Sequence, residues 1–181
     1  EVGEGQATPV VDDERIYLFT RTGEHQGITC LDRASAATLW RSEESVRFDI
    51  VHRDAYKMGQ GPKSTPLLHK RRLYALDIDG RLSAYEAKDG RVLWRRSFAD
   101  EFENSSLYFG ASTSPLIAGG LLIVHVGGND SGALRAFDLD SGQTLWSWNE
   151  PPSHASPIVV EIGGIEQLVT QSQNLRAGID L

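Results

Sequence analysis

Four positions in this sequence, each three residues before a proline, carry a polar or charged side chain. The residues are Gln6, Lys63, Ser112 and His154, and the prolines are Pro9, Pro66, Pro115 and Pro157. If the segments around the prolines are copies of one structural unit, the four side chains form a ring at matching places. An ammonium group and an imidazole in such a ring can hold an anionic ligand. The alternative is that these side chains only hydrogen-bond to loop carbonyl groups.

Other candidate binding residues lie in long segments between the expected structural units. The first segment, expected over 41–63, contains His52 and Tyr56 as well as Lys63. Asn129 and Asp130 follow two glycines, which favour unusual backbone angles, although ordinary turn chemistry explains this pair equally well. Further connecting segments are expected over 95–112 and 147–155. Because long loops on a rigid framework are often functional, we take these residues as candidate ligand-binding residues: His52, Tyr56, Lys63, Asn129, Asp130 and His154.

No pattern in the sequence predicts a dedicated metal site or catalytic centre. The runs DIDG (77–80) and DLDSG (138–142) begin like a calcium-binding loop, but neither has the later bidentate glutamate at the required spacing. The five histidines are scattered, and His125 lies in the alternating run LLIVHV, where a strand residue is expected. The single cysteine, Cys30, excludes an internal disulfide and a cysteine-rich zinc site. We therefore predict no metal ligands and assign no catalytic residue.

The composition is that of a globular protein with one sizeable core. The chain has 181 residues, 40% of them hydrophobic, and a formal net charge of −7. The acidic balance argues against nucleic acid as a partner, because a phosphate backbone favours clustered lysine and arginine. The apolar run GGLLIVHVGG is too short for a membrane-spanning helix. The basic run 70–72 is interpreted as a hairpin tip.

An eleven-residue pattern recurs along the chain and says most about the fold. The copies are CLDRASAATLW (30–40), AYEAKDGRVLW (84–94) and AFDLDSGQTLW (136–146), and a fourth begins with GIDL at 178–181. Each complete copy ends in tryptophan and has an acidic residue at its third position. The proline markers recur roughly every 50 residues in phase with this pattern. Two markers in phase predict a propeller or similar repeat array rather than one irregular domain.

Within one repeat, turn signals separate short runs of strand-forming residues. In the second repeat, the pairs Asp79-Gly80 and Asp89-Gly90 divide the sequence into hairpins, because aspartate and glycine accept the backbone angles of tight turns. Four antiparallel strands in about 30 residues are typical of a propeller blade. The sequence therefore predicts an all-β propeller built from four-stranded antiparallel blades.

The repeats also predict where the blades lie and how they are joined. The expected blades cover 5–41, 62–96, 111–148 and 153–181, the last of them incomplete. The tryptophans at the ends of the outermost strands are expected to pack against the neighbouring blade, since an indole buries a large apolar face. The expected joint residues are Trp40, Trp94 and Trp146, with Gly90 and Gly142 in the tight turns.

The pattern Ala-x-Asp/Glu-x-x-x-Gly-x-x-x-Trp resembles the tryptophan-docking motif of the quinoprotein-like (PQQ-repeat) β-propeller superfamily. The resemblance covers residues 5–181 and is specific for the fold, but not for a cofactor. It implies a ring of seven or eight blades, of which this chain holds about three and a half. We expect a fragment of a longer chain, with a ring completed by a second copy as the alternative. One departure from the motif is Ala36, which stands where the other copies have glycine.

The resemblance implies two main functions. The one that we favour is a non-catalytic exported protein, periplasmic or extracellular, that binds a protein partner or small molecule at the loop face around the central channel. The alternative is a PQQ-dependent alcohol or sugar dehydrogenase with calcium, in which Lys63 and His154 meet a quinone-like ligand. The adjacent cysteine pair typical of such enzymes is absent from this sequence. A glycan-binding or glycan-modifying propeller is a third interpretation, supported only by aromatic and acidic loop residues.

Overall fold

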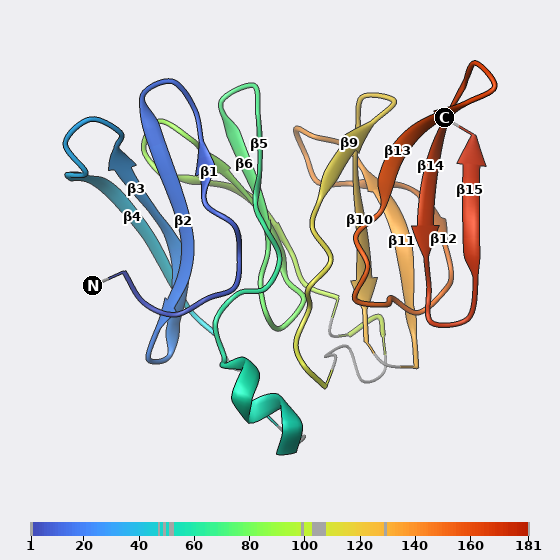
Figure 1. Ribbon diagram of the computed structural model, residues 1–181, viewed down its shortest axis with the longest axis horizontal. Helices are drawn as coiled ribbons and strands as arrows, with labels where there is room; N and C mark the ends of the chain where they lie inside the picture. The colour runs from blue at the N-terminus through green and yellow to red at the C-terminus, as the bar shows by residue number, and fades with distance from the viewer. Residues whose placement is uncertain are drawn as a thin grey trace.

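The protein consists of four antiparallel β-sheets that follow one another side by side (Figure 1). The computed structural model describes residues 2–46, 48, 50, 53–98, 100–102, 108–128 and 130–180. Each sheet is built from strands that are consecutive in the chain, so the order in space equals the order in sequence. This is the arrangement of propeller blades, and the prediction of an all-β partial propeller is confirmed.

Each of the first three sheets has four strands, and the fourth sheet has three strands among the described residues. The first sheet contains β1 (Val10–Val11), β2 (Arg15–Thr22), β3 (His25–Asp32) and β4 (Thr38–Ser45). The second contains β5 (Leu67–His69), β6 (Arg72–Leu76), β7 (Leu82–Glu86) and β8 (Val92–Arg96). The third contains β9 (Leu116–Ala118), β10 (Leu121–Gly127), β11 (Gly132–Phe137) and β12 (Thr144–Trp148). The fourth contains β13 (Ile158–Ile162), β14 (Ile165–Gln171) and β15 (Arg176–Asp180).

The outermost strand of the first blade is longer than the sequence predicts. We expected this blade to end at 41, but β4 continues to Ser45, whereas β8 and β12 end at Arg96 and Trp148, the expected ends of the next two blades. The alternating polar residues after Trp40 resemble loop composition, but here they lie on a half-exposed outer strand. The first connection also contains a 3₁₀ helix, η1 (Arg53–Met58). None of the helices in the described part of the chain is long and apolar enough to cross a membrane.

A tryptophan–glycine contact joins the first blade to the second, and the same contact joins the second to the third. Trp40 lies on Gly90, and Trp94 lies on Gly142. A Cβ atom at Gly90 would come within 2.5 Å of the Trp40 ring, and one at Gly142 within 2.6 Å of the Trp94 ring. Both glycines also have a positive φ, of 75° and 66°. The motif glycine is therefore required twice, for the turn and for the contact.

The indole nitrogen of each docked tryptophan donates a hydrogen bond to the neighbouring blade. Trp40 Nε1 donates to the Ala87 carbonyl at 3.2 Å, and Trp94 Nε1 to the Leu139 carbonyl at 3.1 Å. Each acceptor directly follows the acidic residue of the next copy of the motif. The buried polar end of each indole thus has a partner, which a buried indole normally requires.

The first and third positions of the motif also have structural explanations. The first residue lies directly opposite the tryptophan across the outer strand pair, as in Ala84↔Trp94 and Ala136↔Trp146, and Cys30 takes this place opposite Trp40. All three small residues are fully buried. In the first and third copies the acid closes the turn: Asp32 Oδ1 accepts the backbone N–H of Ala34 and Ser35, and Asp138 Oδ1 that of Asp140 and Ser141. The small residue therefore leaves room for the indole on the neighbouring strand, and the acid stabilises the turn that joins the two strands.

The joint between the third and fourth blades differs from the other two. Trp146 packs there in an apolar cluster that includes Leu168 and Ile179. Beside this cluster lies His125, which is 1% exposed and donates from Nε2 to the Glu150 carbonyl at 2.8 Å. The Nδ1 atom of His125 and the Thr170 hydroxyl are buried without a hydrogen-bond partner among the described residues. This joint therefore contains two buried polar side chains, His125 and Thr170, beside its apolar cluster.

A ladder of hydrogen bonds connects all four blades just before their innermost strands. The backbone N–H of Thr8 donates to Thr65 Oγ1 at 3.1 Å, that of Thr65 to Ser114 Oγ at 3.0 Å, and that of Ser114 to Ser156 Oγ at 2.9 Å. All four residues stand directly before the marker prolines. The repeated hydroxyl is thus a rung between neighbouring blades, a role that was not predicted from the sequence.

Candidate functional site

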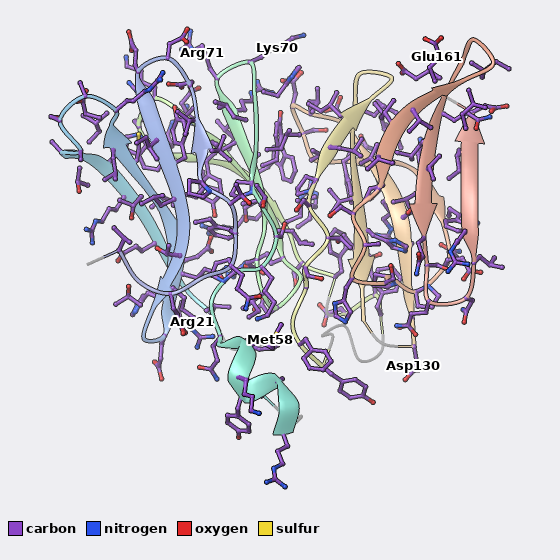
Figure 2. All side chains as sticks on the ribbon, viewed as in Figure 1. Arg21, Met58, Lys70, Arg71, Asp130 and Glu161 are labelled. Atoms are coloured by element: carbon purple, nitrogen blue, oxygen red, sulfur yellow. The ribbon has the colours of Figure 1, made fainter. Side chains whose placement is uncertain are left out.

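The loops at one end of the sheets form what we call the loop face. It comprises the connections from each blade to the next and the turns between the second and third strands of each blade. In Figure 1 it is the lower edge, where η1 projects from the sheets. Figure 2 shows Met58 and Asp130 on this edge, whereas Lys70, Arg71 and Glu161 lie on the opposite edge.

The four side chains that precede the proline markers meet at one pocket on the loop face. The pocket has a volume of about 640 Å³ and is lined by Gln6, Lys63, Ser112 and His154 together with Met58 and Phe109. We call it the axial pocket. The four side chains at matching places in the repeats thus line one pocket, and each repeat contributes one of them.

Hydrogen bonds hold the polar residues of the axial pocket in position. Ser112 Oγ and His154 Nδ1 are 3.0 Å apart, and the His154 ring meets Phe109 edge-on with the ring centroids 5.7 Å apart. Lys63 Nζ donates to the Gly59 carbonyl at 3.1 Å, and Gln6 Nε2 to the Met58 carbonyl at 3.2 Å. Gln6 and Lys63 therefore bond to loop carbonyls, as the alternative interpretation predicts, and they line the pocket at the same time.

The electrostatic character of the axial pocket is positive on one side. Burial lowers the pKa of the Lys63 amine, and the nearby Glu4 carboxylate opposes this shift. No acidic side chain is among the described residues that line the pocket itself. The Lys63 ammonium group has three N–H donors, and one of them donates to the Gly59 carbonyl. Lys63 is therefore the main cationic group at this place.

The N-terminal segment and the segment 59–63 position Gln6 and Lys63 by packing along one another. The backbone N–H groups of Gln6 and Ala7 donate to the Pro62 carbonyl at 2.7 and 3.1 Å. A Cβ atom at Gly61 would clash with the Glu4 backbone, so only glycine allows this approach. The sequence GQGP before Lys63 thus has a structural reason in the close contact of two backbones.

The remaining candidate residues do not line the axial pocket among the described residues. Tyr56 lies on η1 and is 68% exposed, so it projects from the loop face rather than into the pocket. Asp130 lines an adjoining pocket of about 330 Å³ that shares Phe109 and His154 with the axial pocket. His52 and Asn129 lie outside the described residues. The structure therefore brings Lys63 and His154 together and places Asp130 on the far side of His154.

Sequence reasoning missed the two apolar walls of the axial pocket, Met58 and Phe109. Met58 is the only methionine of the chain and ends η1. Phe109 precedes Gly110, which has a φ of 83° and packs against Ile78 so closely that a Cβ atom would clash. An aromatic residue before a glycine and just ahead of a proline marker is a signal that could have found Phe109.

The β6–β7 turn, which resembles a calcium loop, is filled by an arginine. Arg81 donates from its backbone N–H to Asp77 Oδ1 at 2.7 Å and from Nε to Asp77 Oδ2 at 3.0 Å. Burial, together with the neighbouring Asp79, raises the pKa of the Asp77 carboxyl group well above its ordinary value. The guanidinium group therefore takes the place that a cation would need.

The described residues do not fit a quinone cofactor held by calcium. Calcium prefers six to eight oxygen ligands, with carboxylates among them, and no group of three or more His, Cys, Asp or Glu residues lies together in the described part of the chain. The Lys63 ammonium group cannot bind a metal, and the Gln6 amide oxygen supplies only one of the oxygen ligands that calcium needs. We derive no chemical step through PQQ or calcium for these residues.

A second cavity lies on the opposite end of the blades. It has a volume of about 570 Å³ and lies between the first two sheets, where Arg15, Arg71 and Lys88 face Asp12 and Glu14. Arg15 Nη1 donates to the Ala87 carbonyl at 2.8 Å, and Asp12 accepts hydrogen bonds from the Tyr17 hydroxyl and two backbone N–H groups. Arg15 and Asp12 already have partners within the fold, so the axial pocket is the better candidate site.

Comparisons with known proteins agree with this architecture. A family model described as outer membrane protein assembly factor BamB matches residues 24–180. Quinoprotein alcohol dehydrogenase PedH of Pseudomonas putida is 27% identical over 145 residues, which is 78% of this chain and 22% of that protein. The assembly factor BamB of Shewanella oneidensis is 31% identical over 84 residues, which is 45% of this chain and 21% of that protein.

A solved structure shows the same fold. The crystal structure of BamB from Moraxella catarrhalis aligns with 97% of this chain and 49% of its own, with a TM-score of 0.67 and 15% sequence identity. The chain spans only about a fifth of the length of the curated alcohol dehydrogenases that it matches. Activities of those whole proteins are therefore not carried over to this chain.

Proposed function

Because this chain belongs to the PQQ-repeat β-propeller family whose model is described as outer membrane protein assembly factor BamB, we propose that it is a non-catalytic binding or scaffold protein. Its partner contacts the loop face around the axial pocket. The BamB relative from Shewanella oneidensis is named as an outer membrane protein assembly factor, and a role in holding a protein partner agrees with that description. A periplasmic or extracellular location belongs to the same proposal.

The observation that carries the proposal is the composition of the loop face. The axial pocket combines apolar walls with one cation, and three apolar or aromatic residues in or beside the pocket are exposed. Tyr56 is 68% exposed, Met58 44% and Tyr108 52%. Aromatic residues and methionine are enriched at protein interfaces, where they supply most of the binding energy. A loop face of this kind favours a macromolecular partner over turnover of a small substrate.

Photo-crosslinking tests this proposal directly. A benzophenone amino acid is placed at Tyr56, on the loop face, or at Lys70, on the opposite edge (Figure 2). The protein is expressed in the cells that naturally contain it and then irradiated. We expect a discrete protein adduct from position 56 and none from position 70. Equal adducts from both positions, or none from position 56, would argue against a partner at the loop face.

A PQQ-dependent dehydrogenase is the second candidate, and the similarity to PedH is the observation that favours it. PQQ and calcium are added together, and the melting temperature and dye-linked oxidation of ethanol and glucose are measured. We expect neither a thermal shift nor dye reduction, because the described residues lack a calcium site. A saturable shift together with substrate oxidation would replace the scaffold proposal with the enzyme.

A further inference from the structure

The axial pocket has a feature that a general protein-binding face does not require. Its lining combines one partly buried cation, Lys63, with two apolar side chains, Met58 and Phe109. A ligand that matches this arrangement carries a negative group attached to an apolar body. Because the pocket is open to the loop face, such a ligand can enter without any movement of the blades.

Lys63 is held in a suitable position for an anion. Its amine is anchored by the Gly59 carbonyl at 3.1 Å, and the segment that carries it is fixed by the backbone contacts of Gln6 and Ala7 with Pro62. An anchored ammonium group loses little conformational entropy on binding, which makes the interaction more favourable. A carboxylate accepts hydrogen bonds only, so it can use the remaining N–H donors of the amine.

The charges around the pocket determine where the negative group of a ligand can bind. Glu4 is the acidic group that acts on Lys63, and Asp130 lines the adjoining pocket beyond His154. The chain as a whole carries a net charge of −7. Lys63 is the only lysine or arginine among the described residues that line the pocket, so a carboxylate that enters the pocket is attracted to that residue, whereas Arg53 and Lys57 lie outside the pocket on η1.

The surroundings of the pocket favour a peptide over a small molecule. Tyr108 lines the adjoining pocket and Tyr56 is exposed on η1, so both add apolar surface on the loop face beyond the axial pocket. A small carboxylate fills the pocket but leaves these side chains uncovered. A peptide of several residues fills the pocket and also covers the side chains beyond it. Long apolar contacts around a central polar anchor are typical of peptide recognition.

We propose that the axial pocket receives an acidic side chain of a partner polypeptide, with its carboxylate on Lys63 and flanking apolar residues on Met58 and Phe109. This inference rests on the proposed function, because it specifies what the partner presents to the loop face. It assigns Lys63 as the residue that distinguishes an acidic segment from a neutral one of the same shape.

The test uses three fluorescein-labelled peptide pools and fluorescence anisotropy. In the first pool a central Asp is flanked by random Leu, Phe, Met and Tyr, and the other two pools have Asn or Lys at the centre. We expect the Asp pool to bind at least about tenfold more tightly than the Asn pool, since a hydrogen bond to a charged group contributes about 1.5–3 kcal/mol. Equal binding of the two pools, or no binding of the Asp pool, overturns the proposal.

Two variants with the same change of charge identify the residue. Lys63→Met is expected to reduce the affinity for the Asp pool at least about tenfold and to leave that for the Asn pool unchanged. Lys70→Met, on the opposite edge (Figure 2), is expected to leave both unchanged. Equal effects of the two variants would overturn the assignment. Since the comparison of Asp and Asn pools uses the unmodified protein, it remains decisive if Lys63→Met does not fold.

Competition distinguishes a peptide from a small molecule. Benzoate and phenylacetate carry a carboxylate on an apolar body but cannot reach Tyr56 or Tyr108 from the pocket. We expect them to displace the Asp pool only weakly. If they bind as tightly as the peptides, the pocket is a site for small carboxylates, and the peptide proposal fails. Crosslinking from position 56 is independent of these outcomes, so a failure of this inference is distinguishable from a failure of the proposed function.

Discussion

The joints between the blades and the axial pocket use the repeats in opposite ways. At the first two joints the same residue types recur, with Trp40 on Gly90 and Trp94 on Gly142. At the axial pocket the same positions hold four different side chains, one from each repeat. Residues that recur with the repeat therefore build the fold, and residues that vary at a fixed place give the protein its individual surface.

The first prediction removes a joint. Trp94→Ala deletes an 8% exposed indole that packs on Gly142 and donates to the Leu139 carbonyl. We expect the free energy of unfolding, measured by urea denaturation, to fall by about 3–5 kcal/mol. Tyr56→Ala, which removes a 68% exposed ring from the loop face, is the control and should cost less than about 0.5 kcal/mol. Similar losses in both variants would contradict the account of the joint.

The second prediction separates the turn from the contact at a motif glycine. Gly142→Ala must adopt a φ of 66° and also displace the Trp94 ring. Gly119→Ala has a similar φ of 56°, but a Cβ atom there has no neighbour within 4 Å. We expect about 1–2 kcal/mol of destabilisation at Gly119 from the backbone alone, and clearly more at Gly142. Equal losses of unfolding free energy would show that the tryptophan contact does not require glycine.

The third prediction concerns the joint that differs from the other two. Burial lowers the pKa of His125. Near pH 6.5 the unfolded chain therefore binds a proton at this imidazole more readily than the folded protein does. The unfolding free energy should therefore fall as the pH decreases below that value, by up to about 1.4 kcal/mol per pH unit.

The matched variant for that prediction is His125→Gln, which keeps a polar side chain but does not titrate. The other four histidines are common to both proteins, so the difference between the two stability curves belongs to His125. Parallel curves between pH 7 and pH 5 would exclude a role of His125 at this joint.

The fourth prediction concerns the copy of the motif that departs from glycine. Ala36 has a φ of 57°, close to that of Gly142, and is exposed. Because a left-handed backbone is unfavourable for alanine but not for glycine, we expect Ala36→Gly to stabilise the protein by about 0.5–1 kcal/mol. A loss of stability in thermal or urea unfolding would mean that the alanine methyl group makes a contact absent from the described structure.

The sequence was sufficient for the parts of the molecule that repeat. The positions of Trp40, Trp94 and the turn glycines gave the blades, because a recurring pattern can be compared with itself. The spacing before each proline also brought Lys63 and His154 to one pocket. In contrast, Met58 and Phe109 occur once each in loops of different length, so no internal comparison could identify them.

The full length of the first outer strand, β4, could not be predicted from the sequence either. Residues after Trp40 alternate in burial along β4 as far as Ser45, but their polarity resembles that of a loop. The ladder through Thr65 and Ser114 shows a different limit. Its hydroxyl groups were visible as a marker, yet their function depends on which backbone N–H of the neighbouring blade comes near, and only the fold determines that.

The most direct test of the distinction between building and binding residues compares two substitutions that are two positions apart. Lys63→Met alters a side chain of the axial pocket, and Thr65→Val removes a rung of the ladder between Thr8 and Ser114. Unfolding free energy and affinity for the Asp peptide pool are measured for both. We predict that Lys63→Met changes stability by less than about 0.5 kcal/mol but weakens binding at least about tenfold, whereas Thr65→Val costs about 1 kcal/mol and binds normally. If Lys63→Met destabilises the fold and still binds the peptides, the account is contradicted.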